Sequence, residues 1–392
     1  MKVAVVSLMQ SDPWGGSEEL WAEMAHAALD AGHDVAVSVL RWPTLHARLQ
    51  GLRQKGAQVM TRQRPRLPSV DRLVSRALGR DVRVPRPPLV QRVSAFGWLR
   101  DYRPDVICVN QGVTYDAVHF PALMAYLKTS GVPYVLVCQA NTEWTEDAAV
   151  RARARELFGA AARVVFVSRR NLDVAERQLA RRIPNACVVR NPINLASVEP
   201  VAWPTSSTRR FATVARYSTF PKGQDVLLHA LSAGPWKARD WRLRLYGRGG
   251  DETYIGDLVS HYGLADRVEL VGHAADMRAL WADNHLLVLA SRMEGTPLAL
   301  VEAMLCARPA VVTDVGGNTE WVEEGRTGWV AEAPSALHVS AALERAWAAV
   351  SEWEVMGSRA RETALRQYDP RPGETLLGIV LDATGATVEV SR

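Results

Sequence analysis

The 392-residue sequence lacks the features that mark several protein classes. No run approaches the roughly 18 apolar residues of a membrane-spanning helix, and the apolar start, Met1 to Leu8, is too short for a signal-peptide core. Only four cysteines occur, none in a CxxC pair or beside a histidine, and the nine histidines show no metal-ligand spacing. We therefore expect a cytoplasmic protein with reduced, buried thiols, no metal site and no resident cofactor.

Two further absences narrow the function. The stretch between Ser7 and Gly16, which follows the first apolar run, lacks the G-x-G-x-x-G fingerprint of a dinucleotide site, and this disfavours a NAD-binding dehydrogenase. Hydrophobic residues make up 48% of the chain and charged residues 23%, so extensive disorder is excluded. The net charge of +5 suggests acidic small molecules or anionic surfaces as partners, and we expect no nucleic acid.

The chain is too long for one ordinary hydrophobic core, so two domains are expected. Short apolar runs alternate with amphipathic stretches throughout, which is typical of βαβ units and parallel sheets. The predicted strands are Val3–Val6, Val35–Leu40, Val106–Asn110, Tyr134–Cys138, Val164–Val167, Ala186–Val189, Phe211–Ala215, Arg242–Tyr246, Val268–Val271, Leu286–Ala290 and Ala310–Thr313. Residues from Ser335 to about Gln367 are predicted to be helical.

Three prolines and a Ser/Thr run between Pro192 and Arg210 indicate a linker between the two halves. We therefore divide the chain into four parts by residue number. The expected parts are a first Rossmann-like domain at 1–195 that binds the acceptor, a linker at 196–210, a second Rossmann-like domain at 211–367 that binds the donor, and a C-terminal segment at 368–392 that returns to the first domain.

The most informative stretch runs from Glu294 to Met304 and follows a predicted strand. Thr296 is a good N-cap, and Pro297 suits the first position of a helix. A helix would then begin at the carboxyl end of a parallel strand, where free N–H groups favour phosphate oxygens. Gly295 would allow close approach of a ligand. Glu302 lies among apolar neighbours, so its carboxylate needs a polar partner.

Two cations follow the first strand of the second half. Arg216 and Lys222 belong to a loop between a strand and a helix, at the sheet edge that also carries Glu294. Two cations there can stabilise the charge of a departing diphosphate, a task that Mg²⁺ performs elsewhere. In the first half, Gly15 and Gly16 can present amide groups to the same diphosphate, although a tight turn would also explain them.

Taken together, these motifs resemble the GT-B glycosyltransferases of family 4, sometimes called glycosyl transferases group 1. The resemblance covers nearly the whole chain and is densest from Val268 to Val330. The residues that carry it, in the family's order, are Gly272, Leu280, Ser291, Glu294, Glu302, Ala303, Met304, Pro309, Asp314–Asn318, Glu320 and Gly325–Gly328. The implied fold class is α/β, with two Rossmann-like doubly wound domains facing a central cleft.

The resemblance also implies roles for individual residues. Glu302 would bind the ribose hydroxyls and Glu294 would touch the transferred sugar. The amides of Gly295, Thr296, Pro297 and Leu298 form the implied phosphate contact. Arg216 and Lys222 match the family's phosphate-binding cations, and the loop with Gly15 and Gly16 would close over the donor. Family members retain the anomeric configuration, with the leaving phosphate thought to help deprotonate the acceptor.

Two departures from the family pattern affect the sugar and the base. Many relatives have a histidine after the strand that ends at Cys138, where this chain has Gln139 to Glu143, so either Gln139 or Asn141 would hold the sugar. Relatives often have a Gly-x-Gly-Pro turn where this chain has Gly247–Gly250, which includes Arg248. The resemblance therefore does not identify the base of the nucleotide donor. Trp14 and Trp144 lie in loops at the predicted cleft and could stack on an acceptor.

A basic insert interrupts the first half. Arg62–Arg92 holds nine arginines against two aspartates, a local charge of +7 that exceeds the whole chain's +5. Such a segment suits an anionic acceptor or an anionic cytoplasmic membrane surface, whereas a solvated loop paired with acids elsewhere is equally compatible.

The predicted function is therefore a metal-independent, retaining glycosyltransferase of the hexosyltransferase type. The expected partners are a UDP- or GDP-sugar donor and a glycan, a lipid-linked or a small-molecule acceptor, as in polysaccharide biosynthesis. The alternatives are a nucleotide-sugar epimerase or hydrolase of the same fold and, less favoured, the NAD-binding dehydrogenase.

Overall fold

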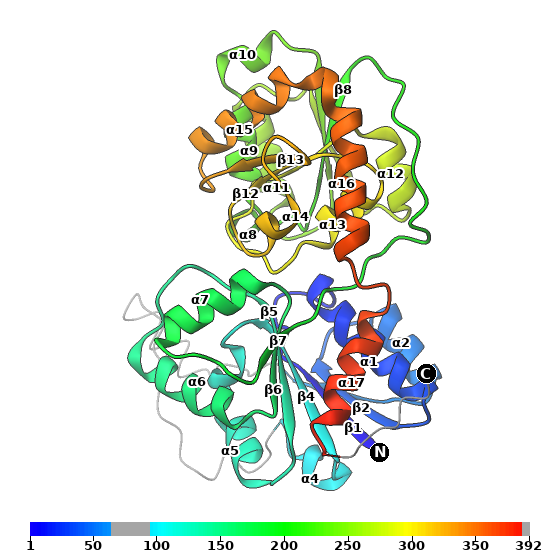
Figure 1. Ribbon diagram of the computed structural model, residues 1–392, viewed down its shortest axis with the longest axis vertical. Coiled ribbons are helices and arrows are strands. Elements are labelled where there is room, and N and C mark those ends of the chain that lie inside the picture. Colours follow the sequence, from blue (N-terminus) through cyan, green and yellow to red (C-terminus); the bar gives the residue numbers. More distant parts are fainter. Residues whose placement is uncertain (64–94, 386–392) are drawn as a thin grey trace.

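The computed structural model describes residues 1–63 and 95–385, which form two α/β halves stacked along the long axis (Figure 1). The strands of the first half are β1 (Lys2–Ser7), β2 (Asp34–Leu40), β3 (Gln58–Arg62), β4 (Val106–Val113), β5 (Tyr134–Ala140), β6 (Arg163–Phe166) and β7 (Ala186–Val188). Its helices are α1 (Gly16–Asp30), α2 (Ala47–Gln54), α4 (Trp98–Tyr102), the 3-10 turn η2 (Asp116–His119), α5 (Pro121–Thr129), α6 (Ala148–Ala160) and α7 (Arg169–Leu179).

The second half repeats this alternation. Its strands are β8 (Arg209–Val214), β9 (Trp241–Tyr246), β10 (Val268–Gly272), β11 (Leu286–Leu289), β12 (Ala310–Thr313) and β13 (Gly328–Ala331). Its helices are α8 (Thr219–Lys222), α9 (Gln224–Leu231), α10 (Gly234–Lys237), α11 (Glu252–His261), α12 (Met277–Asp283), α13 (Leu298–Leu305), α14 (Asn318–Trp321), α15 (Ala336–Ala348), η3 (Val350–Glu352) and α16 (Trp353–Gln367). A final helix, α17 (Pro372–Asp382), follows α16 in the chain.

Both sheets are parallel throughout. The strand order is β3-β2-β1-β4-β5-β6-β7 in the first sheet and β10-β9-β8-β11-β12-β13 in the second. The order reverses between β1 and β4 and again between β8 and β11, and open α/β sheets bind ligands at the carboxyl ends of strands beside such reversals. The predicted architecture of two Rossmann-like sheets is confirmed.

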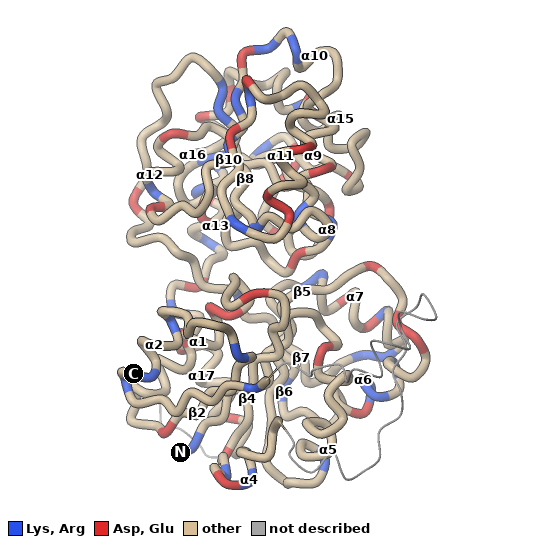
Figure 2. The backbone as a smooth tube through the Cα atoms, turned by 180° about the vertical axis from the view of Figure 1, so that it is seen from behind, with Lys and Arg blue, Asp and Glu red and all other residues tan. Residues whose placement is uncertain are grey.

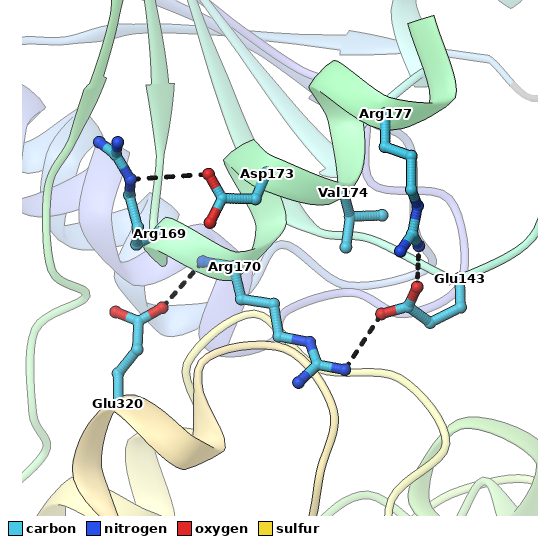
Figure 3. A pocket seen from close by; sticks show the side chains of 7 residues that line it. All are labelled: Glu143, Arg169, Arg170, Asp173, Val174, Arg177 and Glu320. Atoms are coloured by element: carbon cyan, nitrogen blue, oxygen red, sulfur yellow. Dashed lines mark hydrogen bonds and ion pairs between the residues drawn. The ribbon is translucent and has the colours of Figure 1, made fainter. Parts of the chain in front are cut away.

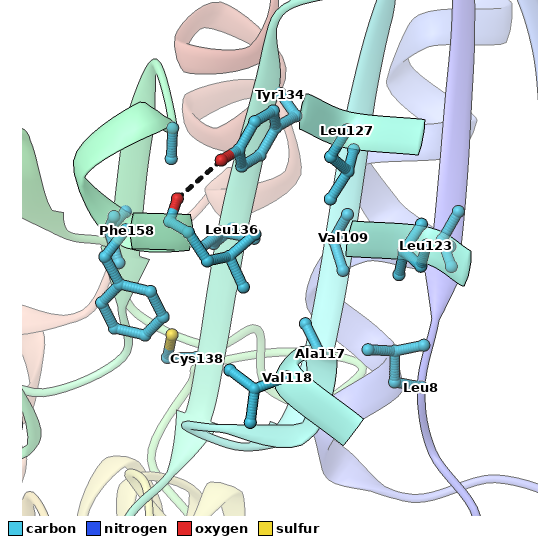
Figure 4. Close-up of a cluster of buried hydrophobic side chains, with 14 of the residues drawn as sticks. Leu8, Val109, Ala117, Val118, Leu123, Leu127, Tyr134, Leu136, Cys138 and Phe158 are labelled. Carbon is cyan, nitrogen blue, oxygen red and sulfur yellow. Dashed lines mark hydrogen bonds between the residues drawn. The ribbon is translucent and has the colours of Figure 1, made fainter. Parts of the chain in front are cut away.

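Apolar residues on both faces of each sheet explain why the strands read as continuous hydrophobic runs. Val3 to Val6 of β1 are fully buried. On one face of the first sheet, Val109 and Leu136 pack with Leu123 of α5 and Phe158 of α6 (Figure 4). On the other face α17 lies against α1, so the end of the chain packs on the first half (Figure 1).

Several local predictions differ from the structure. The edge strands β3 and β13 were not predicted: β3 holds only two apolar residues in five, and β13 begins with a glycine, which is typical of turns. The predicted helix from Ser335 to Gln367 is interrupted by η3, where the Trp353 indole donates to the Ala346 carbonyl at 2.8 Å. At the start of α1, Gly15 occupies the N-cap position and no side chain caps the helix.

The basic insert lies largely outside the described residues. Its first arginine, Arg62, ends β3 and is buried, with its guanidinium donating to the Ser7 carbonyl and, at 2.6 Å, to the Ser38 carbonyl. This side chain therefore belongs to the interior of the sheet and not to an exposed basic surface. In residues 1–63 and 95–385, no helix has both the length and the apolar character needed to cross a membrane.

The cysteines are free thiols, three of them buried, as the sequence predicts. Burial raises the pKa of the Cys108 thiol to about 12, which keeps it protonated and unreactive.

Candidate functional site

The carboxyl ends of the strands in the two sheets face each other at the junction of the halves. Charged residues of both signs line this junction (Figure 2). The loops after β8 and β11 approach it from the second half, and the loops after β1 and β5 approach it from the first. The predicted site residues lie on these loops or on the helices that follow them, except Gln139, which lies near the end of β5.

Lys222 and Glu294 form the best-buried ion pair of the junction. The Lys222 ammonium lies 2.7 and 2.9 Å from the two carboxylate oxygens of Glu294, and the Ser291 hydroxyl donates to the same carboxylate at 2.7 Å. Gly223 makes this possible, because its backbone is left-handed (φ 67°) and a Cβ there would lie 1.9 Å from the Ala290 carbonyl oxygen. The α8 loop can therefore press directly against the end of β11.

Arg216 connects the two halves. Its guanidinium forms an ion pair with Asp12 and donates to the Ser11 hydroxyl at 3.2 Å, and both partners lie on the loop after β1. Burial lowers the pKa of Arg216, partly offset by the nearby Glu294. The carbonyl of Arg216 accepts from the Gln224 amide at 2.7 Å, which fixes the loop after β8.

Glu302 lies on α13 with its side chain almost completely buried. One carboxylate oxygen accepts a hydrogen bond from the backbone N–H of Asn194 at 2.8 Å. The polar partner that the sequence predicted therefore comes from the segment that joins β7 to β8. Desolvation raises the pKa of Glu302 to about 7, although the hydrogen bonds from Asn194 oppose the shift. This buried carboxylate can accept further hydrogen bonds from a ligand whose hydroxyl groups offset its desolvation, such as a diol.

The start of α13 differs from the prediction. Pro297 is the N-cap and Leu298 the first helical residue, so Thr296 does not cap the helix. The Thr296 hydroxyl donates instead to the Val167 carbonyl of the first half at 2.9 Å. Gly295 is required by close approach to the first half, since a Cβ there would lie 1.9 Å from the Gln139 carbonyl oxygen.

The glycine loop meets α13 across the junction. A Cβ on Gly16 would lie 3.1 Å from a methyl of Leu298, whereas Gly15 faces Met9 of its own loop. Trp14, predicted to stack on an acceptor, lies parallel to the His46 ring at 4.9 Å and donates its indole N–H to Glu19 at 2.7 Å. One face of Trp14 is therefore already covered.

The two residues that stand where relatives have a histidine are both buried and hydrogen-bonded. Gln139 donates to Asn110 at 3.3 Å and accepts from Asn191 at 3.0 Å. Asn141 donates to Gln178 at 3.1 Å, and its backbone forms an isolated bridge with Glu294. Asn141 therefore lies beside the charged loop, and the carbonyl of Gln139 faces the same loop at Gly295.

Trp144 and Phe220 are exposed aromatic residues on opposite halves. Their ring centroids are 5.6 Å apart, with Trp144 on the loop after β5 and Phe220 on α8. Phe220 lies two residues from Lys222, so the aromatic pair borders the charged site.

A shallow pocket of about 560 Å³ lies along the same junction, between α7 and α14 (Figure 3). Its charged groups pair with one another. Arg170 forms ion pairs with Glu143 at 3.2 Å and with Asp314, while its backbone N–H donates to Glu320 at 3.0 Å. Because the charges on its walls are matched internally, this pocket is better explained as an ion-pair seam between the halves than as a ligand site.

Sequence reasoning missed the partners that come from the opposite half or from the segment that joins β7 to β8. These are Ser11, Asp12, Arg170, Asn171 and Asn194, and Asn171 donates to the Glu294 carbonyl at 3.2 Å. Only Asp12 carried a local signal, since it precedes the glycine loop. The others lie in ordinary loop or helix positions.

Known proteins of similar sequence include several that are named as glycosyltransferases. The chain is 33% identical over 132 residues to the N-acetyl-alpha-D-glucosaminyl L-malate synthase of Bacillus anthracis, a match that covers 33% of this chain and 34% of that protein. It is 26% identical over 188 residues to the UDP-N-acetylglucosamine–peptide N-acetylglucosaminyltransferase GtfA subunit of Streptococcus gordonii, which covers 47% and 36% respectively. The matches thus span about a third of the length of these curated relatives.

The fold is shared with solved structures over almost the full length. The Anabaena HepE protein in complex with UDP-glucose superposes with a TM-score of 0.69 at 19% identity, covering 98% of this chain and 100% of that one. The model of Glycosyltransferase Family 4 matches residues 14–197, and the model of Glycosyl transferases group 1 matches residues 208–348. Together these matches cover both halves of the molecule, and the chain therefore belongs to the GT-B glycosyltransferases of family 4.

Proposed function

We propose that this protein is a retaining, metal-independent glycosyltransferase that transfers a sugar from a nucleoside diphosphate donor, with a UDP-sugar favoured over a GDP-sugar. The observation that carries the proposal is the arrangement of Arg216, Lys222 and Glu294 at the carboxyl edge of the second sheet, beside the start of α13. UDP is favoured because it appears with the HepE structure and in the name of the Streptococcus relative.

In this proposal the second half binds the donor. Glu302 accepts hydrogen bonds from the ribose diol, and the amide groups at the start of α13 meet the diphosphate. Arg216 and Lys222 stabilise the negative charge that grows on the leaving diphosphate, and Glu294 contacts the transferred sugar.

The reaction then exchanges one glycosidic bond for another. The bond between the anomeric carbon and the diphosphate oxygen breaks, and a bond from the acceptor oxygen forms on the same face of the sugar. The acceptor proton passes to the leaving phosphate, so no protein nucleophile is needed. This balance follows the mechanism that the family resemblance implies.

The acceptor is assigned to the first half. Loops on that half vary freely in such folds, and acceptors in this class include glycans, lipid-linked sugars and small molecules. The Bacillus relative is named for L-malate and the Streptococcus relative for a peptide. For this chain, the exposed ring of Trp144 beside Phe220 is the better stacking surface, because one face of Trp14 lies against His46.

Ligand-induced stabilisation tests the donor assignment. We expect UDP to raise the melting temperature more than GDP, ADP or TDP. A ligand at 100 times its dissociation constant adds about 2.7 kcal/mol to the unfolding free energy, so at equal concentration the nucleotide that binds most tightly gives the largest shift. If none of the four nucleotides shifted the melting temperature at millimolar concentration, the proposal would be wrong.

A turnover assay separates the transferase from the alternatives. A transferase releases nucleoside diphosphate from its donor much faster when an acceptor is added, whereas a hydrolase releases it equally fast without one and an epimerase releases none. The product must also keep the anomeric configuration of the donor. An inverted linkage by NMR would remove the retaining mechanism.

We also propose that Arg62–Arg92 contacts an anionic acceptor or an anionic membrane surface. The proposal rests on its local charge, which is +7 in all and +6 without the buried Arg62, and it concerns residues that lie mostly outside the described part of the chain. Sedimentation with vesicles tests it: we expect binding to anionic but not to neutral lipid, with the binding weakening as salt rises. Equal recovery in the supernatant with both lipids at low salt would favour a soluble acceptor.

A further inference from the structure

Arg216, the cation proposed to stabilise the diphosphate, is engaged by an acid from the opposite half. Its guanidinium pairs with the carboxylate of Asp12 and donates to the Ser11 hydroxyl at 3.2 Å. Both partners lie on the loop after β1, just before Gly15 and Gly16. The same loop is expected to close over the donor.

This pair differs from the other ion pair of the site. Lys222 and Glu294 both belong to the second half, with side chains only 18% and 6% exposed. The pair therefore persists whatever the relative position of the domains. The Arg216 and Asp12 side chains are 36% and 28% exposed and come from different halves. Their pairing exists only while the loop after β1 lies against the second half.

A carboxylate and a phosphate compete for the same guanidinium. Both present paired oxygens that match the donor geometry of arginine, so each can take the same bidentate position. Both are also anions, and two anions a few ångströms apart repel each other. Arg216 therefore cannot keep its contact with Asp12 unchanged while it binds a diphosphate.

We propose that Asp12 is a positioning residue that competes with the donor diphosphate for Arg216. Without donor, the Asp12 carboxylate holds Arg216 and fixes the loop after β1 against the second half. When the diphosphate binds, it displaces Asp12 from Arg216, and the loop becomes free to rearrange over the donor. The inference rests on the proposed function, because it assumes that Arg216 binds phosphate.

The consequence is that Asp12 weakens the binding of the donor diphosphate. Asp12→Asn removes the competing charge and keeps the size of the side chain. We expect this variant to bind UDP about fivefold more tightly, since partly exposed ion pairs are worth up to about 1 kcal/mol. The affinity for uridine, which has no phosphate, stays the same.

Titration calorimetry with UDP and uridine on the full chain measures both effects. Ser11→Ala is the matched control, because it removes a neutral contact to Arg216 and should change UDP affinity by less than twofold. Asp12→Glu keeps the carboxylate, so this variant should bind UDP with the wild-type affinity. In an Arg216→Gln background, Asp12→Asn should no longer change UDP affinity, since the group for which it competes is gone.

The outcomes separate this inference from the proposed function. If Asp12→Asn has the wild-type melting temperature but binds UDP as weakly as the wild type or more weakly, Asp12 is not a competitor and the inference is overturned. Equal tightening for uridine and UDP would also overturn it, because the effect would then not act through phosphate. Wild-type protein that binds no nucleoside diphosphate would overturn the proposed function and this inference together.

Discussion

The facing edges of the two sheets are built from different chemistry. At the edge of the first sheet, buried amides form a chain in which Asn191 donates to Gln139 at 3.0 Å and Gln139 donates to Asn110 at 3.3 Å. Asn110 in turn donates to the buried carboxyl group of Glu18 at 2.9 Å, and Ser7 donates to it at 2.6 Å. This chain of side chains is polar and uncharged apart from Glu18, and its own hydrogen bonds are made within the first half.

The loops after β8 and β11, at the edge of the second sheet, carry formal charges, which the first half meets with Asp12. Lys222, Glu294 and Arg216 gather within one pair of loops, and Glu302 lies behind them on α13. The difference indicates a division of labour. Fixed charges suit a diphosphate, which every donor shares, whereas neutral amides and exposed rings suit acceptors that differ between relatives.

The largest expected effect comes from removing a cation at the charged edge. Lys222→Ala and Arg216→Ala should each lower the turnover number by about 10²-fold or more, because each takes away a preorganised donor to the leaving group. Steady-state kinetics at saturating donor measures this. Arg345→Ala, which breaks an exposed ion pair with Glu324 far from the site, is the control and should leave turnover unchanged. A loss of less than threefold in both site variants would contradict the comparison.

Each edge also buries an acid whose pKa is raised to about 7, and these two acids predict the same pH dependence. Desolvation raises the pKa of Glu18 and of Glu302 to about 7, from 4.5 in the unfolded chain. Between these values the folded state binds more protons than the unfolded state. The free energy of unfolding should therefore fall as pH rises from about 4.5 to about 7, by up to about 3 kcal/mol for each group.

Urea denaturation across this pH range measures the slope. Replacing both acids by Gln should reduce it, and each single variant should remove part of it. The slope that remains below about pH 6 includes the buried Asp116, whose pKa desolvation raises to about 6. If the stability of the double variant fell as steeply as that of the wild type, the raised pKa values would be wrong for these groups.

The contact between the edges can be broken at one backbone position. Gly295→Ala places a Cβ 1.9 Å from the Gln139 carbonyl oxygen, so the Glu294 loop must move away from the first half. We expect kcat/KM to fall at least about tenfold, because misplacing a catalytic loop by an ångström is costly. Gly250→Ala is the matched control, since a Cβ there meets nothing within 4 Å. Equal kinetics in both variants would show that the contact is unimportant for turnover.

A smaller effect should distinguish the two buried acids from each other. Glu302→Gln removes the proposed acceptor of the ribose diol and should weaken UDP binding about fivefold, within the range for hydrogen bonds to charged groups. Glu18→Gln, at the other edge, should leave UDP affinity unchanged. Calorimetry on both variants checks this, and equal affinities would remove the ribose role from Glu302.

The smallest expected effect is that of a chelator. If Arg216 and Lys222 supply the positive charge for the leaving group, turnover in excess EDTA should equal turnover without it. A loss of activity that Mn²⁺ or Mg²⁺ restored would show that the charged edge needs a metal ion.

Local sequence patterns determined much of the molecule. The alternation of apolar runs and amphipathic stretches predicted both parallel sheets, since strands buried on both faces leave such runs. Because carboxyl ends of parallel strands share one edge, the positions of Lys222 and Glu294 in the sequence placed them on the same edge, and they lie 2.7 Å apart. The edge strand β13 was not predicted, because it begins with the glycine that ends Gly325–Gly328, a pattern typical of turns.

Only the tertiary structure decided which groups meet across the junction. Thr296 has the local chemistry of an N-cap, yet it donates to Val167 because the two halves press together there. Asp12 and Arg216 are far apart in the chain, and nothing near either residue encodes their pairing. A local pattern records burial and helix capping, whereas contacts between two separately folded sheets depend on how their surfaces fit, and that fit is a property of the whole chain.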